Sequence, residues 1–421
     1  MFFMIRYKVI RRDGDIMTDS ITFIHAADLH LDSPFKGLKK LPTTIFNDVK
    51  QSTFSALDQL VHHAILKKVD FILLVGDLFD NEKQSLKAQI HLRTAFERLQ
   101  EHNIDVYLSY GNHDYIVGNP YRVRFPENVH IFQEETVTHF TYKKNTNALA
   151  QIYGFSYHNR AVQMNKTSEY EIQNKEIPFH IATLHGSVHG NTIHDPYAPF
   201  SLTDLQTKPF DYWALGHIHE RAELATTPPI IYPGNTQGRH RNEQGEKGCY
   251  IVEMTPTNTL YNFIPLQSMQ FIEHHLDVTH SKTIHDLEQF ILSYMVKTNE
   301  KQLIHLTLAS TSTELQTFQS EGLIDELVEW INEGQSHQDN WQYIYAYNID
   351  VKREKEVVLE DEFISEIEHA IETMDTKTAL TELFHHPVAR KYVTPKADDT
   401  LRQAAKKLLF EELAQTKERD S

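Results

Sequence analysis

Side chains that can ligate metal ions recur in five short stretches between residues 28 and 219. Each stretch stands at or just after the end of an apolar run that is typical of a strand. The stretches are Asp28-Leu29-His30, Gly76-Asp77-Leu78-Phe79-Asp80, Gly111-Asn112-His113-Asp114, His185 within Thr183-Leu184-His185-Gly186, and Gly216-His217-Ile218-His219. Because side chains from successive strand ends can converge on one point, the pattern predicts a metal site with room for two ions.

Asp77 is the predicted bridge between the two ions. It follows a buried apolar run and a glycine, which lets the backbone turn sharply. Asp28 and His30 lie two positions apart on an extended segment, so both point to one side, and the histidines at 217 and 219 have the same spacing. The other predicted ligands are Asp28, His30 and His219 for the first ion, and Asn112, His185 and His217 for the second.

Phosphodiester hydrolysis is the chemistry that such a site supports. Two divalent ions about 3.5–4 Å apart generate hydroxide at neutral pH and neutralise the phosphate during in-line attack. A mixed set of nitrogen and oxygen ligands suits Mn²⁺, Fe²⁺, Zn²⁺ or Co²⁺ better than Mg²⁺ or Ca²⁺. The sequence therefore predicts two divalent metal ions as cofactors.

His113 and Asp80 are the predicted catalytic residues beside the ions. Neighbouring side chains in a strand-like turn diverge, so His113 is expected to face the scissile phosphate while Asn112 faces a metal ion. There the imidazole would stabilise developing charge or protonate the leaving oxygen, a contribution of about 10²–10⁴-fold. The Asp80 carboxylate is expected to hold His113 in the required tautomer.

The front half of the chain alternates strand and helix patterns before it becomes rich in strands. Strand patterns lie at 21–27, 70–75 and 104–109, and helical patterns lie at 44–68 and 85–102. This order predicts a partly parallel sheet with loops of functional residues at the strand ends. Strands then dominate from about residue 129 to 265, so a two-sheet α/β sandwich with flanking helices is expected.

Four segments follow from these patterns. They are an N-terminal extension at 1–20, the domain with the metal site at 21–267, a small α/β module at 268–352, and a charged helical region at 353–421. Residues 271–421 contain 15 Lys and Arg against 29 Asp and Glu, a net charge of −14 out of −17 for the whole chain. Such acidity argues against non-specific coating of a duplex but not against a focused phosphodiester site.

The chain has the features of a cytoplasmic protein without a membrane segment. Cys249 is the single cysteine, so no disulfide forms within the chain. No apolar run approaches the ~20 residues of a membrane-spanning helix. The apolar start at 1–10 precedes its charges instead of following them, unlike a signal peptide.

Taken together, the five stretches resemble the motifs of the calcineurin-like metallophosphoesterase superfamily. Its motifs D-x-H, G-D-x-x-D, G-N-H-D, a lone H and G-H-x-H are all filled, within residues 20–265. Within the superfamily, the run from Phe23 to Leu31 is similar to the opening of the SbcD-type DNA repair exonucleases. More narrowly, the runs Asp28–Phe35 and Tyr232–His240 resemble the YhaO-type proteins of Gram-positive bacteria.

This resemblance implies a Mn²⁺-dependent exonuclease that acts on DNA, with endonuclease activity on single strands as a further expectation. It implies that the module at 268–352 is a capping domain and that the protein is a homodimer. It also implies that C-terminal helices dock on an SbcC-like coiled-coil ATPase. The acidity of 353–421 is unlike a DNA-gripping surface, which leaves docking on a partner and packing on this chain as the two alternatives.

Arg239 and Arg241 follow the last ligand stretch in the run Tyr232–Arg241 and are predicted to bind a DNA phosphate. The alternative is an ordinary turn with exposed arginines. Two other functions also remain open: a metallophosphoesterase acting on cyclic nucleotides or phosphoproteins, and a mainly non-catalytic adaptor of a DNA-bound ATPase.

Overall fold

The computed structural model describes residues 20–81, 84–118, 123–189, 197–295, 300–336, 338–351, 361–373, 375, 380 and 400–409. The chain divides into two compact units, Met1–Asp350 and Val351–Ser421. The domain boundaries predicted after residues 20, 267 and 352 stay predictions, and residues 1–19 of the expected extension lie outside the described residues. Among the described helices, none is long and apolar enough to cross a membrane.

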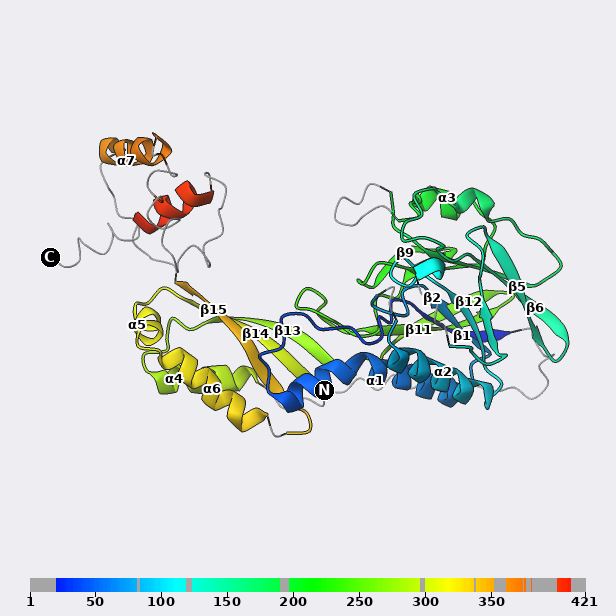
Figure 1. Ribbon diagram of the computed structural model, residues 1–421, viewed down its shortest axis with the longest axis horizontal. Helices are drawn as coiled ribbons and strands as arrows, with labels where there is room; N and C mark the ends of the chain where they lie inside the picture. Colours follow the sequence, from blue (N-terminus) through cyan, green and yellow to red (C-terminus); the bar gives the residue numbers. More distant parts are fainter. Residues whose placement is uncertain are drawn as a thin grey trace. The chain divides into compact units, whose positions relative to one another are not determined.

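A six-stranded mixed sheet forms the first layer of the large unit (Figure 1). Its order is β12-β11-β1-β2-β3-β4, in which β1 to β4 run parallel and β11 is antiparallel to both β1 and β12. The strands are β1 (Ile21–Ala26), β2 (Phe71–Val75), β3 (Asp105–Ser109), β4 (Val129–Ile131), β11 (Gly248–Thr255) and β12 (Asn258–Pro265). Helices α1 (Thr43–Lys67) and α2 (Leu86–Gln100) pack apolar faces, including Leu57 and Leu92, against Ile72 of this sheet.

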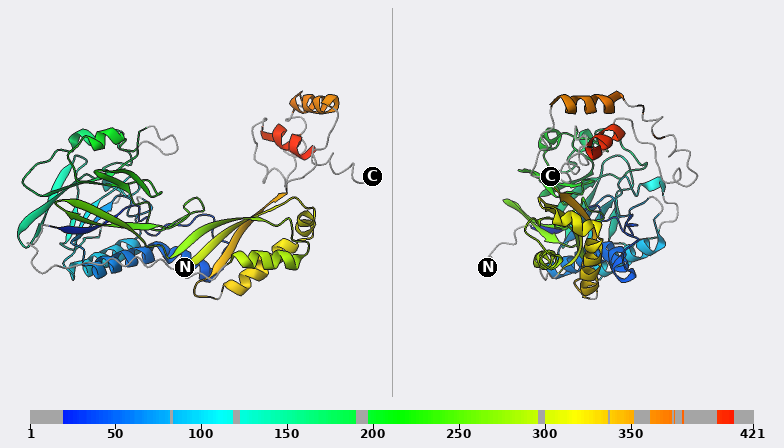
Figure 2. Two further views of the ribbon diagram at one scale, coloured as in Figure 1. Left: turned by 180° about the vertical axis from the view of Figure 1, so that it is seen from behind. Right: turned by 90° about the vertical axis from the view of Figure 1, so that its left-hand side faces the viewer.

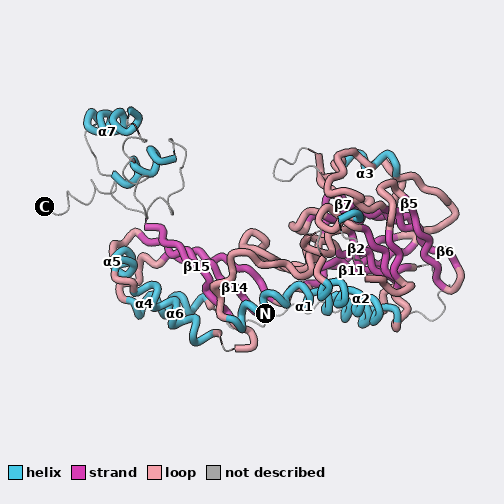
Figure 3. The backbone as a smooth tube through the Cα atoms, viewed as in Figure 1, coloured by secondary structure: helices cyan, strands magenta, loops and turns pink. Residues whose placement is uncertain are grey.

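A second six-stranded sheet packs on the face of the first sheet that lies opposite helices α1 and α2 (Figure 3). Its order is β5-β6-β7-β8-β10-β9, with β6, β7, β8 and β10 parallel and the edge strands β5 and β9 antiparallel. The strands are β5 (Thr138–Lys144), β6 (Asn147–Gly154), β7 (Phe179–His185), β8 (Tyr212–Gly216), β9 (Ala222–Thr226) and β10 (Pro229–Tyr232). Short helical segments accompany it: η1 (Ile116–Gly118), η2 (Thr167–Glu169) and α3 (Leu202–Gln206).

Aromatic side chains fill the space between the two sheets. Phe23 stacks on Phe71 with ring centroids 5.1 Å apart and meets Tyr212 of the second sheet edge-on at 5.4 Å. These three residues belong to one buried apolar cluster that joins the sheets. The predicted two-sheet α/β sandwich with flanking helices is therefore confirmed.

His25 is buried between the sheets and is expected to make stability depend on pH. Its ring contacts the Tyr212 hydroxyl and the Leu215 carbonyl, each at 3.0 Å, and burial lowers its pKa from 6.5 to about 3. Above pH 6.5 neither the folded nor the unfolded chain protonates this ring. Below pH 6.5 this ring binds a proton in the unfolded chain, whereas in the folded chain it stays neutral down to about pH 3. The free energy of unfolding therefore falls as pH falls, by roughly 2 kcal/mol at pH 5.

The substitution His25→Gln, which cannot titrate, should shrink the difference in melting temperature between pH 7 and pH 5, measured in EDTA. His62→Gln, at an exposed position of α1, serves as the control and should keep the wild-type difference. An unchanged pH response in His25→Gln would contradict this account.

A third, smaller sheet completes the large unit. Its order is β13-β14-β15, with β13 parallel to β14, and helices α4 and α6 lie side by side on one face (Figures 1 and 2). The elements are β13 (Met269–Asp277), α4 (Ile284–Tyr294), β14 (Lys301–Ser310), α5 (Glu314–Ser320), α6 (Leu323–Gln335) and β15 (Gln342–Val351). Asp48 of α1 accepts hydrogen bonds from Lys301 Nζ at 2.6 Å and Trp341 Nε1 at 2.8 Å, which ties this sheet to the sandwich.

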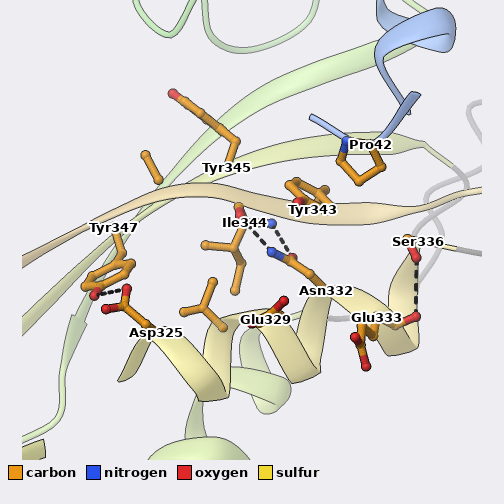
Figure 4. Close-up of a pocket in the computed structure, with 12 residues that line it drawn as sticks. Pro42, Asp325, Glu329, Asn332, Glu333, Ser336, Tyr343, Ile344, Tyr345 and Tyr347 are labelled. Carbon is orange, nitrogen blue, oxygen red and sulfur yellow. Dashed lines mark hydrogen bonds between the residues drawn. The ribbon is translucent and has the colours of Figure 1, made fainter. Parts of the chain in front are cut away.

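A groove of about 560 Å³ lies between α6 and the edge strand β15 (Figure 4). The Tyr347 hydroxyl donates to Asp325 Oδ1 at 2.6 Å, and the Asn332 side chain bonds both backbone groups of Ile344. None of its twelve lining residues belongs to the predicted ligand set, so this groove is separate from the metal site.

The described part of the second unit is helical. Within the region at 353–421 that was predicted to be helical, α7 spans Asp361–Thr373 and residues 400–409 form another helical stretch. Lys406 Nζ lies 2.5 Å from Glu368 Oε1, so these two helices contact each other within the unit.

Candidate metal centre

The predicted ligands stand in loops at the carboxyl ends of five parallel strands. They follow β1 (Asp28, His30), β2 (Asp77), β3 (Asn112) and β8 (His217, His219), or end β7 (His185). The loops after β1 and β2 are joined by their backbones, because His30 N donates to Asp77 O at 3.0 Å. Strand ends of the two facing sheets therefore deliver these side chains to one place.

Four of these residues have a left-handed backbone conformation that side chains with a Cβ rarely adopt. The φ angles are 53° at Asp28, 42° at His30, 50° at Asp77 and 98° at His217. Each such conformation costs on the order of 1–3 kcal/mol and persists only where the surrounding structure enforces it. The backbone at these four ligand residues is therefore strained, and this strained conformation directs their side chains toward the metal centre.

The first cluster consists of Asp28, His30 and His219, whose ligand atoms all lie within 4.8 Å of one another. His30 Nε2 faces His219 Nε2 at 3.0 Å, and His219 Nε2 lies 3.9 Å from Asp28 Oδ1. Asp28 is held in place by the His217 backbone N–H, which donates to its Oδ2 at 3.0 Å. Burial raises the pKa of Asp28 to about 6, and the neighbouring histidines oppose that rise.

The second cluster consists of Asp77, His185 and His217, again with ligand atoms within 4.8 Å of one another. Asn112 joins it, since its Oδ1 lies 3.0 Å from His185 Nε2 and 3.1 Å from His217 Nδ1. His185 Nδ1 donates to the Val75 carbonyl at 3.0 Å, which leaves Nε2 to act as a ligand. A Cβ at residue 76 would collide with the His185 ring, so this turn requires Gly76.

Asp77 lies between the two clusters. Its Oδ2 is 3.4 Å from His185 Nε2 and 3.9 Å from His30 Nε2, one histidine from each cluster. Burial alone would raise the pKa of Asp77, but the adjacent histidines outweigh it and hold the pKa well below the usual range. An ionised carboxylate in this position can reach an ion in either cluster.

The donor set fits two divalent cations. Each cluster offers one carboxylate and two imidazoles, and Asn112 adds an amide oxygen. The two Nε2 atoms of His30 and His219 face each other at 3.0 Å, an arrangement that suits two lone pairs directed at a shared cation. Nitrogen and oxygen donors of this kind suit Mn²⁺, Fe²⁺, Zn²⁺ or Co²⁺.

His113 stands beside the first cluster but outside both ligand sets. Its ring meets the His30 ring edge-on at 5.0 Å, and its backbone N–H donates to Asp77 Oδ1 at 2.9 Å. Its Nδ1 lies 2.8 Å from the main-chain carbonyl oxygen of Asp80. The expectation that the Asp80 carboxylate holds this ring is therefore corrected: the Asp80 backbone makes the contact, which sequence patterns do not reveal.

The Asp80 carboxylate is engaged instead by Arg239. Arg239 Nη1 lies 2.6 Å from Asp80 Oδ1, and Nη2 lies 3.3 Å from Glu243 Oε1. The guanidinium predicted to bind a DNA phosphate is thus turned toward two carboxylates of its own chain. Arg241, the other predicted phosphate contact, is exposed.

Glu243 is a residue of this centre that the sequence reasoning missed. It is 6% exposed, and its Oε1 lies 2.7 Å from His219 Nδ1. Burial alone would raise its pKa, but hydrogen bonds from His219 and His240 and the Arg239 charge hold the pKa far below the usual range. The available signal was an acidic residue two positions after Arg241, with Glu246 close by, and such a pattern is too common to be diagnostic.

Asp114 ends the Gly111–Asp114 motif, where the sequence predicts no ligand role for it, and in the structure it braces two loops. It is fully buried, its Oδ1 accepts Gly111 N, and its Oδ2 accepts Leu78 N, both at 2.7 Å. The carboxylate therefore pins the loop after β3 to the loop after β2.

Asp114→Ala should lower the melting temperature of the metal-free protein by several degrees. Each stranded backbone N–H costs about 1–3 kcal/mol, and thermal unfolding in EDTA reports the loss. Asp339→Ala, at an exposed position, is the matched control. Equal midpoints for the two variants would contradict the bracing role.

Comparisons with known proteins agree with this geometry. The sequence profile of the calcineurin-like phosphoesterases matches residues 21–221. The chain is 40% identical over 382 residues to the uncharacterized metallophosphoesterase YhaO of Bacillus subtilis, covering 89% of this chain and 93% of that protein. The chain belongs to the calcineurin-like metallophosphoesterase family.

More distant members of this family carry names from DNA repair. The DNA double-strand break repair protein Mre11 of Methanocaldococcus jannaschii is 28% identical over 247 residues, which cover 55% of this chain and 62% of that protein. Mre11 of Sulfolobus acidocaldarius is 25% identical over 304 residues, 68% of this chain and 75% of that protein. This metallophosphoesterase is thus distantly related to Mre11 proteins.

Proposed function

We propose that this metallophosphoesterase is a two-metal-dependent DNA phosphodiesterase, an exonuclease that also cuts single strands internally. The observation that carries the proposal is the pair of His/Asp clusters with Asp77 between them. The relationship to Mre11 proteins, which are named for DNA double-strand break repair, supports DNA as the substrate class.

The proposed ligands are Asp28, His30 and His219 for one ion and Asn112, His185 and His217 for the other, with Asp77 shared. When bound, the two ions, most simply Mn²⁺, would activate water and neutralise phosphate charge. His113 would act on the leaving sugar oxygen. Because the Asp80 carbonyl can only accept, His113 Nδ1 carries a proton; Nε2 would face the leaving oxygen and would carry the second proton of an imidazolium when the ring acts as general acid.

Outside the metal centre, Arg241 remains our candidate for a phosphate contact, because its exposed guanidinium lies in the same loop as Glu243. For Arg239 we propose a positioning role, since its donors already meet two carboxylates. We further propose segment boundaries at 20, 267 and 352, a cytoplasmic homodimer, and docking of residues 353–421 on an SbcC-like coiled-coil ATPase.

A substrate panel tests the function directly. Purified full-length protein with Mn²⁺ would be assayed on bis-p-nitrophenyl phosphate, cyclic AMP, a phosphopeptide, and labelled single- and double-stranded DNA, with metal content measured by mass spectrometry. We expect two bound ions per chain and turnover of DNA. Hydrolysis of cyclic AMP or phosphopeptide but not DNA would replace the nuclease assignment by another phosphoesterase activity. Bound metal without any turnover would favour the adaptor role.

A further inference from the structure

Glu243 is a buried carboxylate that has no role in the proposed hydrolysis. Oε1 lies 2.7 Å from His219 Nδ1, while Oε2 accepts Asn235 Nδ2 at 2.9 Å and the Arg239 backbone N–H at 2.7 Å. Both oxygens are therefore saturated by donors, and only the bond to His219 reaches a proposed metal ligand. An acceptor fixed beside Nδ1 determines which nitrogen of the His219 ring carries the proton and which is free to bind an ion.

We propose that Glu243 is a positioning residue that sets the tautomer and direction of His219 and thereby completes the first cluster for its ion. The inference rests on the proposed two-metal site. A carboxylate of this kind behind a ligating histidine also strengthens the imidazole as a donor.

The proton arrangement follows from the chemistry of the contacts. An ionised carboxylate can only accept, so the 2.7 Å contact places a proton on His219 Nδ1. Nε2 then keeps its lone pair, and this atom faces His30 Nε2 at 3.0 Å and Asp28 Oδ1 at 3.9 Å. Arg239 Nη2 lies 3.3 Å from the same Glu243 oxygen and 3.2 Å from His219 Nδ1, and the shorter 2.7 Å contact of Nδ1 with the carboxylate decides the position of the proton.

The loop that bears Glu243 is itself anchored at a distance from the cluster. Gln237 Nε2 donates to the Met269 carbonyl at 2.8 Å, and Gln237 Oε1 accepts Ser268 N at 2.9 Å, next to the start of β13. On the other side, Lys247 Nζ donates to the His219 carbonyl at 3.0 Å. His219 is therefore fixed through both its ring and its backbone, as a pre-organised ligand requires.

The alternative is a purely structural role, in which Glu243 only neutralises the Arg239 charge and accepts the hydrogen bond from the Asn235 side chain. The two roles differ in what Glu243→Gln changes. A purely structural role predicts lower stability of the metal-free fold, whereas a positioning role predicts weaker binding of one ion of the two. Glu246→Gln makes the same chemical change in the same loop at an exposed position and is the matched control.

The test is calorimetric titration of Mn²⁺ into full-length protein stripped of metal, together with thermal unfolding of the same metal-free samples. For Glu243→Gln we expect one binding step to weaken by about 10–100-fold and the other to stay unchanged. Glu246→Gln should match the wild type. In a double-mutant cycle, Glu243→Gln added to His219→Ala should cause no further loss, because Glu243 acts through His219.

Three results would overturn the inference. The first is wild-type Mn²⁺ affinity at both steps in Glu243→Gln. The second is equal weakening of both steps with a large drop in metal-free melting temperature, which would mark a structural role. The third is an additive loss in the double mutant. If the wild-type protein itself bound no Mn²⁺, the proposed function would fail, and this inference would fall with it.

Discussion

Asp77→Asn should abolish metal-dependent phosphodiester hydrolysis while the fold survives. The amide keeps an oxygen that can accept the His113 backbone N–H, a bond of 2.9 Å in the native protein. It lacks the negative charge that lies between His30 of one cluster and His185 of the other. Since bound ions contribute several kcal/mol of transition-state stabilisation, we expect a fall in kcat/KM on the order of 10³-fold or more.

The measurement combines hydrolysis of bis-p-nitrophenyl phosphate, metal content by mass spectrometry and circular dichroism. Asp105→Asn, on a partly exposed residue of β3, is the control and should retain both metal and activity. If Asp77→Asn kept two ions and wild-type turnover, the proposed ligand set would be wrong at its central member.

His113→Ala should also lose turnover but, unlike Asp77→Asn, should retain metal binding. The ring lies outside both ligand sets, and its backbone bond to Asp77 does not need the side chain. Removing a general acid costs about 10²–10⁴-fold in kcat. The loss should be smaller for bis-p-nitrophenyl phosphate than for DNA, because p-nitrophenolate leaves without needing a proton.

A suitable control is His102→Ala, which removes an exposed ring whose Nδ1 likewise contacts a carbonyl, that of Arg98 at 2.9 Å. It should match the wild type on both substrates. Full activity of His113→Ala would show that another group assists the leaving oxygen. An equal loss on both substrates would indicate that the imidazole stabilises phosphate charge instead of donating a proton.

The sequence was sufficient to predict a two-sheet α/β sandwich with a partly parallel sheet, and the convergence of ligand side chains at its strand ends. Strand ends are marked by apolar runs that stop at polar residues, and parallel strands bring those ends to one edge. For that reason the residues at 28, 77 and 217 could be placed together across nearly 200 positions. The short elements β9, α3 and α5 were missed, because each has at most seven residues and little periodicity.

The contacts that hold the ligands and His113 in place could not be predicted from the sequence. Whether the Asp80 carbonyl or its carboxylate meets His113 depends on the local turn, and residue type does not encode it. The pairing of Arg239 with Asp80 joins positions 159 apart in sequence. Glu243 reaches His219 only because the loop after β10 folds back over the loop after β8. Such contacts follow from tertiary packing instead of local pattern.

The position of β1 in its sheet has a consequence for how the protein is made. Among the described strands β1 is made first, yet one of its neighbours is β11, with Ile21 opposite Met254. At ordinary translation speeds of about 5–20 residues per second, that edge waits roughly 10–50 s for its partner. Asp28 and His30 are made well before His219, so the first cluster stays incomplete until synthesis has passed residue 219.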